Sequence, residues 1–156
     1  PKEAEYVIRR FRRYAELRPQ DDRAQYYYAI SLWKGKRSQD SSADLSTVES
    51  LLQKSIALDG GIPEAHMQLG DLYAGQHLYG KSIPEYARAL ELNPDLSDAH
   101  YRLGTDYVHV GQKDAAQREF AVYQKLRAAH LAEVDKERAE VQQFVYSEKE
   151  ATSSKF

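Results

Sequence analysis

The sequence repeats itself with a period of 34 residues, and this feature restricts the fold more than any other. Residues 63–96 and 97–130, aligned at that offset, share eight identical positions, where chance would give about two. The identities pair Ala65 with Ala99, His66 with His100, Leu69 with Leu103, Gly70 with Gly104, Tyr73 with Tyr107, Glu85 with Glu119, Ala87 with Ala121 and Leu92 with Leu126. A fixed period of this length is typical of arrays in which each unit stacks on its neighbours to bury an apolar face.

Each unit is predicted to consist of two helices. Apolar residues recur at intervals of three and four, as along Ala65, Leu69 and Leu72, which is the spacing of one helix face. Glycines place the breaks between helices near residues 75–80 and 111–114. Gly70 and Gly104 lie inside helices, where glycine costs about 1 kcal/mol relative to alanine. We therefore expect close contact between the paired helices at these two glycines.

The same register extends to both ends of the chain. It predicts a half-repeat over residues 2–21, a repeat over 22–62 with an expanded turn at 35–46, and regular repeats over 63–96 and 97–130. Residues 113–145 contain no Gly or Pro, so the last helix either continues or bends near Ala128. An apolar stripe there, Leu131, Val134, Val141 and Val145, predicts a capping helix over 128–147, or alternatively a surface that pairs with a second chain. Residues 148–156 are expected to form a polar tail.

This pattern resembles the tetratricopeptide repeat (TPR) family, whose unit is a 34-residue helix-turn-helix. The residues that carry the resemblance in one unit are Leu69, Gly70, Tyr73, Tyr86, Ala89 and Pro94. The resemblance implies an all-α fold over residues 1–127, a right-handed solenoid of antiparallel helix pairs, followed by a long C-terminal helix. It also implies that the first helix of each pair lines a concave face that binds peptides of partner proteins.

Composition excludes several other functions. There are no cysteines, so disulfides and thiolate metal sites are absent. A net charge of -2 provides no basic surface for nucleic acid, and no apolar run approaches the ~20 residues of a membrane span. The chain begins at Pro1 without a signal-peptide pattern, so we expect a processed or excised piece of a longer protein. We expect a soluble protein that is either cytoplasmic or exported after removal of an N-terminal segment.

Two sequence features are compared with the patterns of nucleotide-binding and metal-binding sites. Residues 75–82 match the phosphate-loop pattern G-x-x-x-x-G-K-[ST], yet they follow a predicted helix rather than a strand, so nucleotide binding is only a remote alternative. The five histidines show no metal-ligand spacing, and His66 and His100 are one repeat apart, which favours a packing role. We therefore expect no enzyme activity, no metal and no cofactor.

The leading hypothesis is a protein-protein interaction scaffold that binds a partner's peptide segment in the concave groove. Register places these candidate partner-binding residues on the inward faces of the first helices: Tyr26, Tyr27, Ile30, Met67, Gln68, Asp71, Tyr101, Arg102 and Thr105. The alternative is a structural or oligomerisation role, in which the chain packs on its own missing N-terminal portion or on another copy. Self-association would then use the C-terminal helix or the cut end near Lys2.

Overall fold

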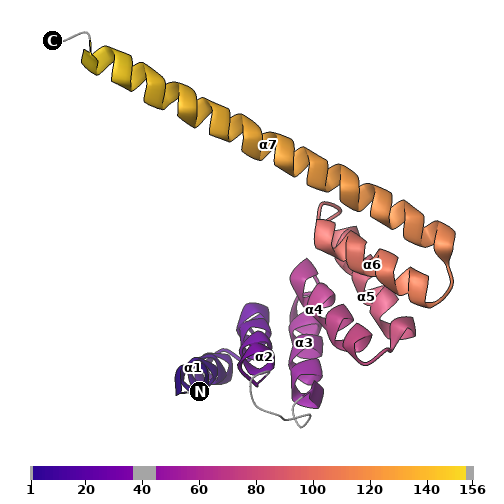
Figure 1. Ribbon diagram of the computed structural model, residues 1–156. Helices are drawn as coiled ribbons and strands as arrows, with labels where there is room; N and C mark the ends of the chain where they lie inside the picture. Colours follow the sequence, from indigo (N-terminus) through magenta and orange to yellow (C-terminus); the bar gives the residue numbers. More distant parts are fainter. Residues whose placement is uncertain (1, 37–44, 154–156) are drawn as a thin grey trace.

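The computed structural model describes residues 2–36 and 45–153. In these ranges the chain forms seven helices and no strand: α1 (Lys2–Leu17), α2 (Asp22–Lys36), α3 (Leu45–Leu58), α4 (Pro63–Gly75), α5 (Tyr79–Leu92), α6 (Ser97–His109) and α7 (Lys113–Ser153). Each helix packs against the next along the chain, so the molecule is an open array rather than a bundle (Figure 1). The predicted all-α helical solenoid is confirmed. Most of the predicted expanded turn, residues 37–44, lies outside the described residues.

The core follows the apolar register. Small residues at one position of each first helix, Ala24, Ala65 and Ala99, are completely buried. A continuous cluster that includes Leu52 and Leu69 joins α2, α3 and α4. Burial along successive helix pairs, rather than one central core, is what a stacked array of repeats requires.

Gly70 and Gly104, the two glycines that the repeat register aligns inside helices, lie where paired helices touch. A Cβ atom on Gly70 would lie 2.6 Å from Cε1 of Tyr86, and one on Gly104 would lie 2.7 Å from Cε1 of Phe120. Both distances are too short for carbon atoms in contact. The expected close contact is therefore present in both units, and the aromatic ring of the second helix fills the space that a side chain would need.

The turns between paired helices repeat as well. Gly111, between α6 and α7, has a φ of 79°, and His77, at the same position one repeat earlier, has a φ of 59°. Left-handed backbone is easy for glycine and uncommon for other residues. The same turn geometry is therefore kept in the α4–α5 connection although its residue is unfavourable for it.

The C-terminal segment follows one of the two courses that the sequence left open, because the last helix continues instead of bending near Ala128. Helix α7 runs unbroken from Lys113 to Ser153, through residues 128–147 and into the segment 148–153 that we expected to be a polar tail. It packs on α6, but its second half stands clear of the array (Figure 1), and Leu131 and Val141 are more than half exposed. Without Gly or Pro nothing interrupts the backbone hydrogen bonding, so the helix continues beyond its contacts. The division of the chain into repeats stays a prediction.

The phosphate-loop-like segment is a connection between two helices. Gly75 ends α4, and Gly80, Lys81 and Ser82 belong to the start of α5. The Lys81 ammonium lies 5.3 Å from the centre of the Tyr73 ring. Ser82 is fully buried and its hydroxyl donates a hydrogen bond to Asp106 on α6, where burial raises the pKa of the Asp106 carboxyl despite this bond. The two side chains that would bind phosphate and magnesium thus join neighbouring helices.

Replacing Lys81 by alanine should change the free energy of unfolding by no more than about 1 kcal/mol, because the side chain is exposed and loses only its contact with a ring. Neither form should bind ATP with magnesium in isothermal titration calorimetry. ATP binding that requires magnesium and disappears in Lys81→Ala would instead establish a nucleotide site.

Candidate functional site

One face of the array carries a polar pocket of about 480 Å³, formed mainly by the first helix of each pair. Helix α2 contributes Trp33 and Lys34, α4 contributes Gln68, Asp71 and Ala74, and α6 contributes Arg102. Tyr86 of α5 completes the lining. We call this pocket the groove. Because its lining comes from three successive units, only the stacked array can form it.

Asp71 is the centre of the groove's polar contacts. Its Oδ2 atom forms an ion pair with the Arg102 guanidinium, and its Oδ1 atom accepts a 2.7 Å hydrogen bond from the Tyr86 hydroxyl. Burial, followed by the hydrogen bond to Asp71, raises the pKa of Tyr86. Burial alone would lower the pKa of Arg102, but the hydrogen bond and charge of Asp71 raise it. The carboxylate therefore fixes one side chain from each of two neighbouring helices.

The structure brings together three of the nine residues predicted to bind a partner: Gln68, Asp71 and Arg102 line the groove. Tyr27 and Ile30 line a separate apolar pocket of about 410 Å³ between α1 and α2, which shares Lys34 with the groove. Tyr26 is partly buried against the core, where burial and then the charge of Glu64 raise its pKa.

The other three predicted residues lie on α4 and α6 outside the groove lining. Met67 is half-buried on α4. Tyr101 is half exposed and packs against the rings of Phe120 and Tyr123 on α7. The Thr105 hydroxyl donates a 2.9 Å hydrogen bond to the Tyr101 carbonyl of its own helix.

Sequence reasoning missed four residues of the groove: Trp33, Lys34, Ala74 and Tyr86. The register could have found two of them, because Trp33 and Ala74 occupy the same place in their units, one turn after Ile30 and Asp71. In the sequence, Tyr86 stands out only as one of the residues that carry the family resemblance, and its side chain is 1% exposed. Its hydroxyl nevertheless reaches Asp71, a contact that repeat register does not indicate.

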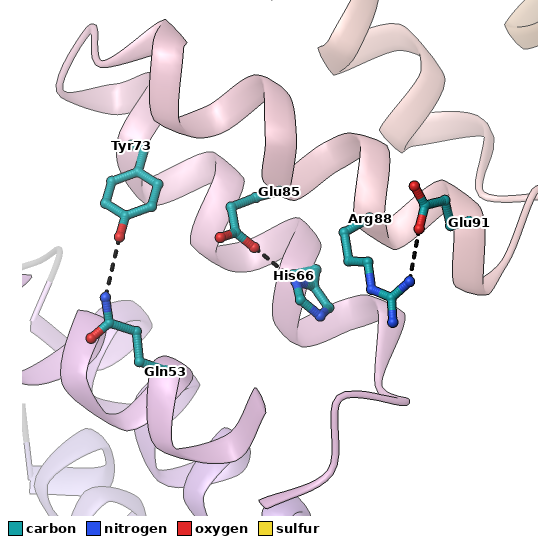
Figure 2. Close-up of polar contacts among 6 residues, drawn as sticks. All are labelled: Gln53, His66, Tyr73, Glu85, Arg88 and Glu91. Carbon is teal, nitrogen blue, oxygen red and sulfur yellow. Dashed lines mark hydrogen bonds and ion pairs between the residues drawn. The ribbon is translucent and has the colours of Figure 1, made fainter. Parts of the chain in front are cut away.

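A second polar feature recurs in both regular units, between the two helices of each pair. Nδ1 of His66 lies 2.7 Å from Oε2 of Glu85, and Nδ1 of His100 lies 2.6 Å from Oε2 of Glu119. Figure 2 shows the first pair, together with the hydrogen bond from Gln53 of α3 to Tyr73 of α4 and the exposed Arg88–Glu91 pair on α5. Both histidines are buried, so the pairs join helices rather than face a substrate.

Residues 2–36 and 45–153 contain no group of three or more acidic or histidine side chains that could hold a metal ion. No described helix is long and apolar enough to cross a membrane. The groove can offer hydrogen bonds, charge and an aromatic surface, which are means of binding.

Solved structures with similar folds include MamA. A crystal structure of MamA aligns with a TM-score of 0.70 at 19% sequence identity, over 80% of this chain and 69% of that chain. MamA 41-end from Desulfovibrio magneticus RS-1 aligns with a TM-score of 0.68 at 22% identity, over 82% of this chain and 68% of that chain.

A third similar structure is the second TPR of Spaghetti (RPAP3), bound to the HSP90 peptide SRMEEVD. It aligns with a TM-score of 0.61 at 18% identity, over 72% of this chain and 97% of that chain. No family model matches the chain, and no curated protein matches its sequence. Together, the helix array and these likenesses show that the chain has a TPR-like helical-repeat fold.

Proposed function

We propose that the chain is a protein interaction scaffold that binds an extended peptide segment of a partner in the groove, and that it belongs to the TPR family. The observation that carries the proposal is the lining of the groove, in which α2, α4 and α6 present side chains to one continuous space. A peptide laid across three helices contacts each of them, so its affinity depends on the stacked repeats. The similar RPAP3 domain, which holds an HSP90 peptide, supports this use of the fold.

The groove combines an aromatic surface with an excess of positive charge. Trp33 provides the aromatic surface, and aromatic and arginine side chains often dominate binding energy at interfaces. Lys34 and Arg102 outnumber Asp71, whose carboxylate is already engaged by Arg102 and Tyr86. We therefore expect a peptide with an acidic side chain near Lys34, and affinity that falls as salt rises.

Replacing Lys34 by glutamate should weaken peptide binding by about 1 to 3 kcal/mol, because it reverses an exposed charge in the groove lining without disturbing the core. Peptides selected on the wild-type protein from a display library of unstructured segments serve as probes. Their affinities for each variant are then measured by fluorescence anisotropy at two salt concentrations.

Lys54→Glu is the matched control, because Lys54 is exposed on α3 and lies outside the groove lining. It makes the same change in charge and should leave binding unchanged, with circular dichroism showing that both variants are folded. If Lys54→Glu weakens binding and Lys34→Glu does not, the peptide binds another face. If selection recovers no peptide whose binding is weakened by Lys34→Glu, the proposed function is wrong.

A further inference from the structure

The free half of α7 presents an apolar face with acidic borders. After Val134, the last half-buried residue of the helix, every side chain up to Glu150 is exposed. Val141, Phe144 and Val145 are 62%, 64% and 45% exposed. Phe144 and Val145 lie three and four residues after Val141, which places all three on one side of the helix. Glu137, Glu140 and Glu148 lie three or four residues from them on the same side, and Arg138, which forms an ion pair with Asp135, lies at its edge.

The opposite end of the array presents an apolar face with basic residues. Tyr6, Val7, Phe11 and Tyr14 of α1, together with Arg10 and Tyr27, line an apolar pocket of about 600 Å³. Leu17 continues this face and is 69% exposed. Arg13, also exposed, lies three residues from Arg10, so two guanidinium groups accompany the apolar side chains.

The two faces match in charge and in length. Residues 2–17 carry five basic and three acidic side chains, whereas residues 131–150 carry six acidic and three basic ones. Tyr6 to Leu17 and Glu137 to Glu148 each cover eleven residue steps, which is about 16 Å of helix. Exposed apolar patches with complementary charged borders are typical of interaction sites.

The two faces cannot meet within one molecule. Helix α1 packs on α2 and α7 packs on α6, so they occupy opposite ends of the array, and the free half of α7 stands clear of it (Figure 1). We propose that the acidic face of α7, around Phe144, binds the basic face of α1 on a second copy of this chain. This contact is distinct from the peptide groove, because neither face contributes a residue to the groove lining.

Because the contact joins two different surfaces, every dimer keeps one free α1 face and one free α7 face. Such a head-to-tail contact extends into longer chains unless it closes into a ring. A contact three turns long is smaller than the ~1,000 Å² that characterises stable complexes, so the association should be reversible and depend on concentration.

The test uses the full 156-residue chain in two forms, each with one face disabled. Arg10→Glu/Arg13→Glu disables the α1 face, and Phe144→Asp disables the α7 face. Sedimentation velocity over a concentration series should show wild-type species larger than dimers. Each variant alone should associate about tenfold more weakly or worse. An equimolar mixture should form heterodimers and nothing larger, because only one productive contact remains.

Two further variants complete the test. Lys54→Glu/Arg88→Glu makes the same change in net charge on exposed residues of α3 and α5, and should associate like the wild type. Arg10→Glu/Arg13→Glu combined with Glu137→Arg/Glu140→Arg should recover association, because the charges are exchanged between the faces.

Four results would overturn the proposal. The first is a wild-type chain that stays monomeric over the whole concentration series. The second and third are an Arg10→Glu/Arg13→Glu variant, or a Phe144→Asp variant, that associates with itself as strongly as the wild type. The fourth is a mixture of these two variants that forms no heterodimer. None of these results bears on peptide binding in the groove, which Lys34→Glu tests separately.

Discussion

Replacing Tyr86 by alanine should lower the free energy of unfolding by about 3 to 5 kcal/mol, as expected when a large buried aromatic side chain is removed. Tyr86 is 1% exposed and its ring lies directly against Gly70 of the paired helix. Its loss leaves a cavity between α4 and α5 and removes the hydrogen bond to Asp71. Urea denaturation followed by circular dichroism measures the effect.

Two variants separate the contributions of the ring and the hydroxyl. Tyr86→Phe keeps the ring and should cost about 1.5 to 3 kcal/mol, the range for losing a hydrogen bond to a charged group. Tyr146→Ala is the matched control, because Tyr146 is 69% exposed on the free half of α7, and it should change stability by less than about 0.5 kcal/mol. A Tyr86→Ala protein as stable as the wild type would show that this ring does not join the two helices.

Replacing Gly70 or Gly104 by leucine should destabilise the protein by about 1 to 3 kcal/mol or more, because the new side chain enters space that an aromatic ring already fills. The first added carbon would lie 2.6 Å from a ring carbon of Tyr86 or 2.7 Å from one of Phe120. Helix propensity alone predicts the opposite sign, a gain approaching 1 kcal/mol. The sign of the change in the free energy of unfolding therefore shows whether these glycines are required by the close contact between the helices.

Gly80→Ala provides the control for this experiment. Gly80 is exposed in the first turn of α5, and apart from its chain neighbours and the backbone of its own helix no atom lies within 4 Å of the position that its Cβ would take. Alanine there should stabilise the protein by about 0.5 to 1 kcal/mol, because it reduces the backbone freedom of the unfolded chain and meets no neighbour in the folded one. If Gly104→Leu is stabilising too, the contact between α6 and α7 near Phe120 is not as close as the structure shows.

Much of the architecture could be predicted because its causes are local. The recurrence of apolar residues at intervals of three and four predicts the helices, and the glycines near residues 75 and 111 predict where α4 and α6 end. The repeated glycines Gly70 and Gly104 predict the close helix contact that the structure shows. The straight course of α7 was left open, because a helix without Gly or Pro bends or continues according to what it packs against.

The groove was predicted only in part. Register placed Gln68, Asp71 and Arg102 on the inward side, and these three line the pocket. It also placed Tyr26 and Tyr101 there, although one packs partly into the core and the other against α7. Repeat register indicates which side of a helix a residue occupies, but the reach and rotamer of its side chain depend on its neighbours.

The sequence by itself therefore determined the helices, their pairing and the order in which they stack, since these follow from a period repeated along the chain. Only the tertiary structure decided which side chains share the groove. The contacts of Asp71 with Tyr86 and Arg102 join three helices from two units. Only the tertiary structure, likewise, showed that half of α7 stands clear of the array. Contacts of this kind depend on distances between helices and on side-chain packing, which periodicity along the chain does not specify.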